Sequence, residues 1–127
     1  MQQELSDVAN IIENPSNLFD YYETSDIYLS TSKYEGCSNT IMEAMTFSLP
    51  VVATNVGDNS YLIKEQANGF LCNVGDWETI AERLLLLCNS GNMCYEFGKQ
   101  SFQIINNDFS LERMEEKYIS LINSLTC

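Results

Sequence analysis

The sequence contains no histidine, and only six of its 127 residues are lysine or arginine. Without histidine the chain lacks the commonest general base, and it cannot form a Cys-His pair or a Ser-His-Asp triad. Eighteen acidic residues stand against the six basic ones and give a net charge of −12. Nucleic acid and anionic membrane surfaces are therefore poor partners for this chain.

Long apolar runs are missing as well. No stretch approaches the roughly 20 apolar residues that are needed to span a bilayer, and residues 1–4 lack the features of a signal peptide. We therefore expect a cytoplasmic protein without a transmembrane segment. The five cysteines are irregularly spaced and match no zinc or redox motif. No metal site is expected.

What the sequence does contain is the pattern of one globular α/β domain. Its 127 residues are 45% hydrophobic, which is enough for a single core. Strand-like and helix-like segments alternate, which predicts a parallel sheet with helices on both faces. The apolar run Val51–Thr54 predicts a central strand that is covered on both sides. The other expected strands are residues 8–12, 26–30 and 69–72, the last a small edge strand. The expected helices are residues 17–23, 39–47, 60–63, 77–88, 92–105 and a final helix capped by Ser110.

Apolar side chains at helical spacing predict which side of these helices faces the core of the domain. The stripe Ile41, Ala44 and Met45 is expected to be buried. Trp77 and the leucines at 84–87 are expected to pack against the rest of the domain. The acidic residues of the last helix, Glu112, Glu115 and Glu116, are expected to form a solvated face.

Glu35 and Glu43 lie eight positions apart and bracket the one segment whose chemistry indicates a ligand. Gly36 permits a tight turn, and residues 38–40 are Ser, Asn and Thr, which all favour the N-cap of a helix. A helix that begins there presents unpaired N–H groups and a positive dipole end beside Glu35. That arrangement suits a phosphate, whereas carboxylates accept hydrogen bonds from sugar hydroxyls. The combination predicts a site for a glycosylated or ribosylated diphosphate.

This segment resembles the E-x7-E signature of GT-B glycosyltransferases of family 4 (glycosyl transferases group 1). The similarity rests on four segments in order: Ser32-Lys33-Tyr34-Glu35-Gly36, Glu43-Ala44-Met45, Leu49-Pro50-Val51-Val52-Ala53-Thr54 and Asn68-Gly69-Phe70-Leu71. It continues through Asp76 and the helix after Asp108-Phe109-Ser110, and it covers about residues 21–125. The resemblance implies a Rossmann-like parallel sheet that is the incomplete C-terminal half of a GT-B fold.

The resemblance also implies a reaction and the residues that serve it. A sugar would pass with retention from a nucleotide-diphosphate sugar to an acceptor hydroxyl, in the synthesis of cell-surface polysaccharide or glycoconjugate. Glu35 would be catalytic and hold hydroxyls of the donor sugar, while Glu43 would bind the ribose hydroxyls. The backbone between them would hold the diphosphate, and the donor-binding residues implied there are Gly36, Cys37, Ser38, Asn39 and Thr40. The family needs no metal, and no cofactor is implied beyond the donor substrate.

The same comparison implies that parts of the enzyme lie outside the sequence. In the family, a preceding strand and helix carry an Arg and a Lys to the donor phosphates, and a separate N-terminal domain binds the acceptor. In this chain only Lys33 lies near the motif. We therefore expect residues 1–127 to be a single truncated donor-binding domain, either a fragment or a natural truncation, that is inactive alone.

Three alternatives remain open. Thr40-Ile41-Met42-Glu43 is also a capping-box pattern, in which Glu43 would fold back to the Thr40 amide. Glu35 could be a solvated loop acid. For the chain as a whole, the rival is a non-catalytic remnant or interaction module from a truncated glycosyltransferase gene.

Overall fold

The structure, a computed structural model, describes residues 8–125. Its centre is a three-stranded parallel sheet in the order β1-β2-β3. The strands are β1 (Tyr28–Ser30), β2 (Val51–Thr54) and β3 (Gly69–Cys72). Val52 of β2 pairs with Leu29 on one side and with Phe70 on the other. The predicted central strand is confirmed, and β3 is an edge strand of the described sheet.

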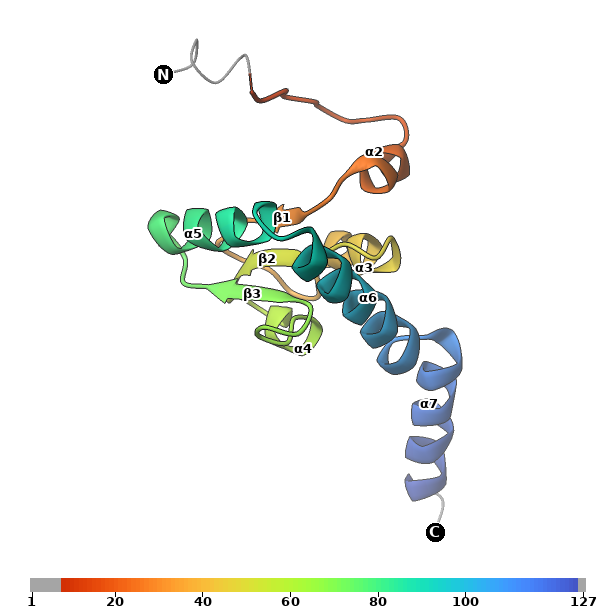
Figure 1. Cartoon of the computed structure of the whole chain (residues 1–127). Helices are drawn as coiled ribbons and strands as arrows, with labels where there is room; N and C mark the ends of the chain where they lie inside the picture. Colours follow the sequence, from red (N-terminus) through yellow and green to blue (C-terminus); the bar gives the residue numbers. More distant parts are fainter. Residues whose placement is uncertain (1–7, 126–127) are drawn as a thin grey trace.

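Helices fill the connections between these strands and follow the last one (Figure 1). All six helices that the sequence predicts begin within one residue of their expected positions. The helices are α2 (Leu18–Thr24), α3 (Asn39–Thr46), α4 (Asn59–Leu62), α5 (Trp77–Cys88), α6 (Gly91–Asp108) and α7 (Leu111–Leu125).

Helices cover both faces of β2. Successive side chains of a strand point to opposite faces, and Val51, Val52 and Ala53 are all 0% exposed. Val51 and Ala53 pack with Ile41 and Met45 of α3, and with Leu62 of α4 and the adjacent Ile63. Val52 packs on the other face with a second set of buried side chains, namely Phe70, Cys72, Ile80, Leu87 and Phe97. The predicted two-sided α/β layer and the predicted core stripe of α3 are both confirmed.

α6 lies across the amino ends of the strands. A Cβ on Gly98 would lie 2.1 Å from the carbonyl oxygen of Ser48, just before β2. On the same helix, Ser101 donates a hydrogen bond of 3.5 Å to the carbonyl of Asn68, just before β3. α6 therefore covers the amino-terminal edge of the sheet and leaves the carboxyl-terminal edge to the loops.

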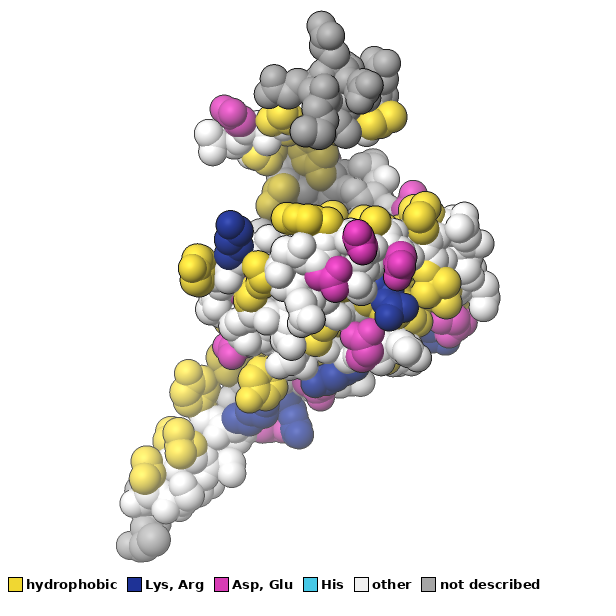
Figure 2. All heavy atoms as spheres, turned by 90° about the vertical axis from the view of Figure 1, so that its left-hand side faces the viewer, with side chains coloured by type: hydrophobic (Ala, Val, Ile, Leu, Met, Phe, Trp, Pro, Cys, Tyr) yellow, Lys and Arg dark blue, Asp and Glu magenta, His cyan; other side chains and the backbone are white. Residues whose placement is uncertain are grey.

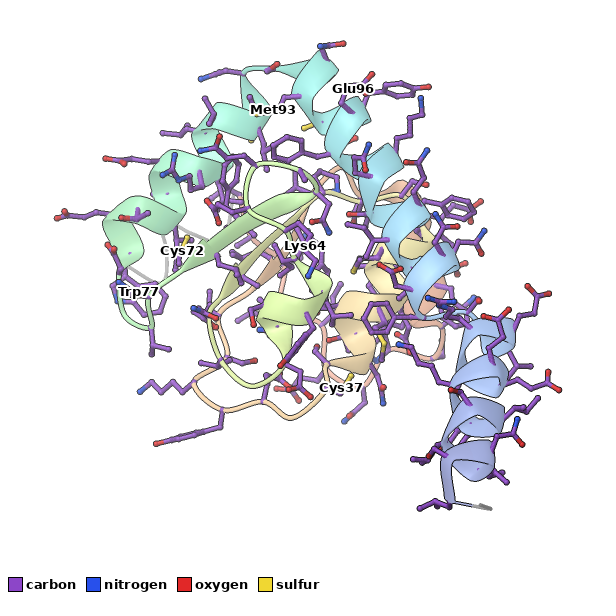
Figure 3. The ribbon with its side chains drawn as sticks, turned by 90° about the horizontal axis from the view of Figure 1, so that it is seen from below. Cys37, Lys64, Cys72, Trp77, Met93 and Glu96 are labelled. Atoms are coloured by element: carbon purple, nitrogen blue, oxygen red, sulfur yellow. The ribbon has the colours of Figure 1, made fainter. Side chains whose placement is uncertain are left out.

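Two predictions of the sequence are wrong. Residues 8–12 form no strand, and all of them are exposed. An apolar run becomes a strand only where a neighbouring strand pairs with it, and β1 pairs only with β2 among the described residues. Trp77 is 61% exposed instead of packed. It is the first residue of α5 and lies at the outer end of that helix, away from α6 (Figure 3).

The leucine run of α5 is divided between two environments. Leu87 is buried and Leu84 packs against the core, whereas Leu85 and Leu86 are exposed. Helical periodicity explains the split, since only one side of α5 faces the sheet.

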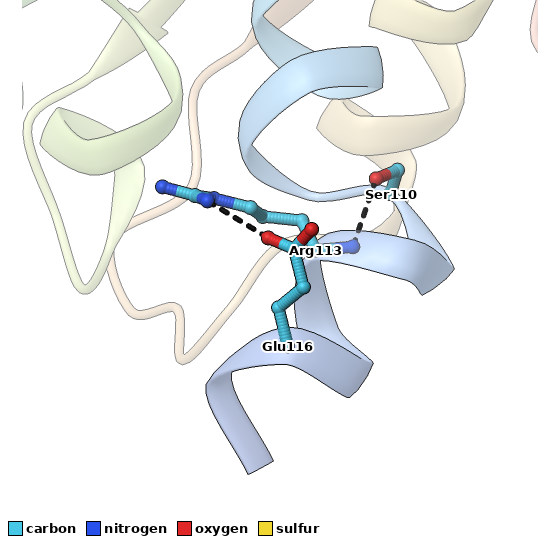
Figure 4. Close-up of polar contacts among 3 residues, drawn as sticks. All are labelled: Ser110, Arg113 and Glu116. Carbon is cyan, nitrogen blue, oxygen red and sulfur yellow. Dashed lines mark hydrogen bonds and ion pairs between the residues drawn. The ribbon is translucent and has the colours of Figure 1, made fainter. Parts of the chain in front are cut away.

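α7 projects away from the body of the molecule, and none of its residues is buried (Figures 1 and 2). Ser110 caps it: its side chain accepts a hydrogen bond from the Arg113 amide at 3.2 Å (Figure 4). Arg113 and Glu116 form an exposed ion pair at 2.9 Å. The acidic side of α7 is solvated as predicted, but its apolar side chains are exposed as well.

Candidate functional site

The candidate site is built around the start of α3. Ser38 is the N-cap of this helix, and its Oγ accepts a hydrogen bond from the Ile41 amide at 3.3 Å. The same Oγ lies 3.2 Å from Oγ1 of Thr40. Ser38 is buried, while the neighbouring Cys37 and Asn39 are exposed. The predicted helix start is confirmed, and with it the orphan amides at that end.

Glu43 does not form the alternative capping box. A capping box pairs the N-cap residue with the residue three positions later. The N-cap of α3 is Ser38 and Thr40 lies inside the helix, so Thr40 and Glu43 cannot form this pair. The Glu43 carboxylate instead accepts a hydrogen bond at 3.0 Å from the hydroxyl of Tyr22 on α2. Glu43 is thus held by a neighbouring element and is only partly buried.

Glu35 is also held by a hydroxyl group. Oγ of Ser32 donates to Oε1 of Glu35 at 2.8 Å. The backbone carbonyl of Ser32 in turn accepts a hydrogen bond from Oγ1 of Thr54, which is buried at the end of β2. Glu35 is partly buried. This chain of contacts ties the acid to the carboxyl ends of β1 and β2, which disfavours the alternative of a freely solvated loop acid.

The loop after β2 packs directly on the loop that carries Glu35. Gly57 has a φ of +51°, and a Cβ there would lie 2.0 Å from the carbonyl oxygen of Glu35. The next amide, from Asp58, donates a hydrogen bond to the carbonyl of Gly36 at 3.0 Å. Gly57 therefore allows the two loops to touch at the carboxyl edge of the sheet, where ligands of open α/β sheets bind.

One buried polar atom at this edge has no partner. Asn59, the first residue of α4, is 0% exposed, and its side-chain amide donates to the carbonyl of Thr54 at 2.9 Å. Its Oδ1 has no hydrogen-bond partner among residues 8–125. Asn59 thus fixes the turn between β2 and α4 through its donor alone.

The remaining predicted residues, between Glu35 and Glu43 in the sequence, are exposed, apart from the buried Ser38. Gly36 is exposed, and a Cβ at this position would meet no atom within 4 Å. Cys37 is exposed at the start of α3 (Figure 3). Thr40 is exposed on the first turn. The structure therefore brings the loop of Glu35, the amino end of α3 and the loop of Gly57 to one place.

Basic groups are scarce around the site. Lys33 is exposed and makes no ion pair, since Arg113–Glu116 is the ion pair found within the described part of the chain. Residues 8–125 also contain no group of three His, Cys, Asp or Glu side chains placed to hold a metal ion. Over the same residues, no helix has both the length and the apolar character that crossing a membrane requires.

The sequence indicated Glu35 and Glu43 but missed the residues that hold them. These are Tyr22, Ser32, Thr54 and Gly57. Burial, together with the hydrogen bond to Glu43 and its negative charge, raises the pKa of Tyr22 above its ordinary range. The Tyr22 hydroxyl consequently stays protonated and remains a donor. Only Gly57 carried a local signal, as a glycine that directly follows a strand and its short turn.

The chain is similar to known glycosyltransferases. Residues 2–103 match the family model described as Glycosyl transferases group 1. An uncharacterized glycosyltransferase of Haemophilus influenzae is 30% identical over 94% of this chain and 34% of its own length. The poly(ribitol-phosphate) alpha-N-acetylglucosaminyltransferase of Staphylococcus aureus is 33% identical over 80% of this chain and 21% of its own length. The chain thus spans about a third or less of these relatives.

Solved structures share the fold. A mutant of TarM from S. aureus, in complex with fondaparinux, alpha-GlcNAc-glycerol and UDP, superposes with a TM-score of 0.85 and 27% identity, over 96% of this chain and 25% of TarM. HepE of Anabaena, in complex with UDP, gives a TM-score of 0.87 at 19% identity, over 97% of this chain and 34% of HepE. The chain therefore belongs to the glycosyl transferases group 1 family, and its helix-covered parallel sheet is part of a GT-B fold.

Proposed function

We propose that this chain is the donor-binding part of a retaining glycosyltransferase. It would bind a UDP-sugar and serve transfer of the sugar to an acceptor hydroxyl, in cytoplasmic synthesis of cell-surface polysaccharide or glycoconjugate. The observation that carries the proposal is the pair of acids: Glu35, in the loop before α3, accepts a hydrogen bond from a hydroxyl at 2.8 Å, and Glu43, on α3, accepts one at 3.0 Å. Similar proteins support the substrate class. One is a capsular polysaccharide biosynthesis glycosyltransferase, CapM of S. aureus, and the TarM and HepE structures contain UDP.

The diphosphate would bind at the amino end of α3. Backbone N–H groups of residues 37–40 are available there, because the Ser38 side chain satisfies only the amide of Ile41. As the bond between sugar and diphosphate breaks, negative charge develops on the leaving group. A fixed helix end stabilises that charge without reorganising.

The two acids would bind the two sugars of the donor. Glu35, in the loop before α3, would be the catalytic residue and would accept hydrogen bonds from hydroxyls of the transferred sugar. Glu43, one turn into α3, would accept hydrogen bonds from the ribose hydroxyls. A carboxylate has two oxygens and about four acceptor positions, so each acid keeps free positions beside the hydroxyl that already holds it.

The acceptor and the cations for the diphosphate would come from other segments of a longer protein. Only six basic residues are present, and Lys33 alone lies near the motif. A pyrophosphate is usually held by charged donors as well as by amides. We therefore propose a preceding strand and helix, and an N-terminal acceptor domain, as partners of this chain.

Titration of UDP and of a UDP-sugar against the longest protein that carries this sequence tests the proposal. Glu43→Gln should weaken UDP binding by about tenfold to a hundredfold, because a hydrogen bond to a charged acid contributes about 1.5–3 kcal/mol. Glu35→Gln should leave UDP binding nearly unchanged but abolish most of the turnover. Glu96→Gln on α6, distant from the start of α3 in Figure 3, removes an equal charge and should change neither. Unchanged UDP affinity in Glu43→Gln would contradict the ribose role.

A further inference from the structure

A single hydrogen bond joins α2 to the candidate site. The hydroxyl of Tyr22 donates to Oε2 of Glu43 at 3.0 Å, across 21 positions of sequence. Tyr22 belongs to α2 and Glu43 to α3, so the contact links two separate elements. Because the bond is to Oε2, the other carboxylate oxygen is left for a ligand.

The ring of Tyr22 is fixed by packing. Tyr22 is 4% exposed and is the one buried residue of α2. It belongs to a buried cluster with Ala44 and Leu49. Its ring centroid lies 5.9 Å from that of Tyr28 and 5.6 Å from that of Phe47, both within the range of aromatic pairs. A hydroxyl on such a ring has one defined position.

Glu43 lacks comparable support of its own. It is partly exposed, and a long acidic side chain on a helix samples several rotamers unless a partner restrains it. Among residues 8–125, the bond from Tyr22 is the side-chain hydrogen bond that Glu43 makes, and the ion pair found there joins Arg113 and Glu116 instead. Tyr22 is therefore the group that sets the orientation of this carboxylate.

We infer that Tyr22 is a positioning residue for the nucleotide ribose: it holds one oxygen of Glu43 so that the other meets the ribose hydroxyls. The inference rests on the proposed function, in which Glu43 binds the ribose. Tyr22 touches no ligand itself and acts through Glu43. Removal of the Tyr22 hydroxyl must therefore weaken nucleotide binding only when the ribose hydroxyls and the Glu43 carboxylate are both present. A merely structural role would not show this dependence.

The test compares UDP with 2′,3′-dideoxy-UDP, which lacks both ribose hydroxyls, by isothermal titration calorimetry. The proteins are the wild type, Tyr22→Phe, Glu43→Gln and the double variant, each in the longest protein that carries the sequence. Tyr22→Phe keeps the packed ring and removes only the donor. We expect it to weaken UDP binding by about threefold to tenfold and to leave dideoxy-UDP binding unchanged. The double variant should bind UDP no more weakly than Glu43→Gln alone.

Tyr21→Phe is the matched control, because Tyr21 is the exposed neighbour on the same helix. It should bind both nucleotides as the wild type does. Wild-type UDP affinity in Tyr22→Phe, alongside a loss in Glu43→Gln, would overturn the inference and leave the proposed function standing. Equal losses for UDP and dideoxy-UDP would assign Tyr22 a structural role only. If the wild type bound both nucleotides equally, the ribose role of Glu43 would be wrong, and the inference with it.

Discussion

The α-carbon of Gly57 faces the backbone of Glu35 so closely that no side chain fits between them. A Cβ at Gly57 would lie 2.0 Å from the carbonyl oxygen of Glu35 and 2.6 Å from that of Gly36. The φ of Gly57 is +51°, a region that residues with a Cβ rarely adopt. The position of the Glu35 loop therefore depends on a glycine 22 residues later in the chain.

Gly57→Ala is expected to displace the Glu35 loop. The clash is with backbone atoms, which cannot rotate away, so the free energy of unfolding should fall by about 1–3 kcal/mol in urea denaturation. UDP binding should weaken as well, because the amides beside the loop move. Gly75→Ala is the matched control: Gly75 also has a positive φ, +82°, but nothing lies within 4 Å of a Cβ there. Equal effects of the two variants would show that backbone strain, and not the contact with Glu35, is responsible.

The contribution of Tyr22 to the free energy of unfolding should decrease at alkaline pH. Burial, and then Glu43 and the neighbouring Tyr28, raise the pKa of Tyr22 in the folded chain, whereas a tyrosine in the unfolded chain has a pKa of about 10. The folded state therefore favours the protonated form. The resulting stability is fully present below about pH 10 and is lost as the pH rises toward the folded pKa.

Urea denaturation of the wild type and of Tyr22→Phe, at about pH 8 and about pH 11, measures this dependence. The difference in the free energy of unfolding between the two proteins should shrink at the higher pH, since phenylalanine carries no proton to lose. Tyr21→Phe, on the exposed side of the same helix, should keep the wild-type dependence. A difference between wild type and Tyr22→Phe that stays constant with pH would contradict the assignment.

α7 is expected to mediate self-association of the 127-residue chain. Met114, Tyr118 and Leu121 are exposed on a helix with no buried residue, and exposed apolar patches of this kind favour association. Analytical ultracentrifugation should show a sedimentation coefficient that rises with concentration. The double substitution Tyr118→Lys and Leu121→Lys should reduce the rise, although it makes the net charge of −12 less negative and so weakens electrostatic repulsion between copies. Leu85→Lys, at an exposed position of α5, is the control, and a monomer at all concentrations would refute the prediction.

The local sequence pattern was sufficient to predict an element whose structure is decided within that element. The run Val51–Thr54 indicated the buried central strand because its first three residues are apolar. The hydroxyl of the last, Thr54, can form a hydrogen bond in the interior. The N-cap residues at 38–40 marked the start of α3 for a similar reason, since a cap acts within one turn of its own helix.

Contacts between distant elements could not be predicted in the same way. The pairing of Tyr22 with Glu43 joins positions 21 apart, and nothing in either local sequence specifies it. The apolar run at residues 8–12 looked like a strand, but a strand exists only with a partner, and its pattern says nothing about whether one is present. Trp77 is a large apolar residue, a type that usually packs in the core. It is exposed because it is the first residue of α5.

α2 is attached through Tyr22, its one buried side chain, and through a ring contact of Phe19 with Phe47 at 5.7 Å between centroids. This attachment has a thermodynamic consequence for the candidate site. A helix of seven residues is too short to be stable alone, so α2 depends on its packing against the rest of the chain. If an open α2 leaves Glu43 without its donor, then opening and nucleotide binding oppose each other. Because such coupling is reciprocal, an occupied site would slow hydrogen exchange of the α2 amides, without any contact between nucleotide and helix being required.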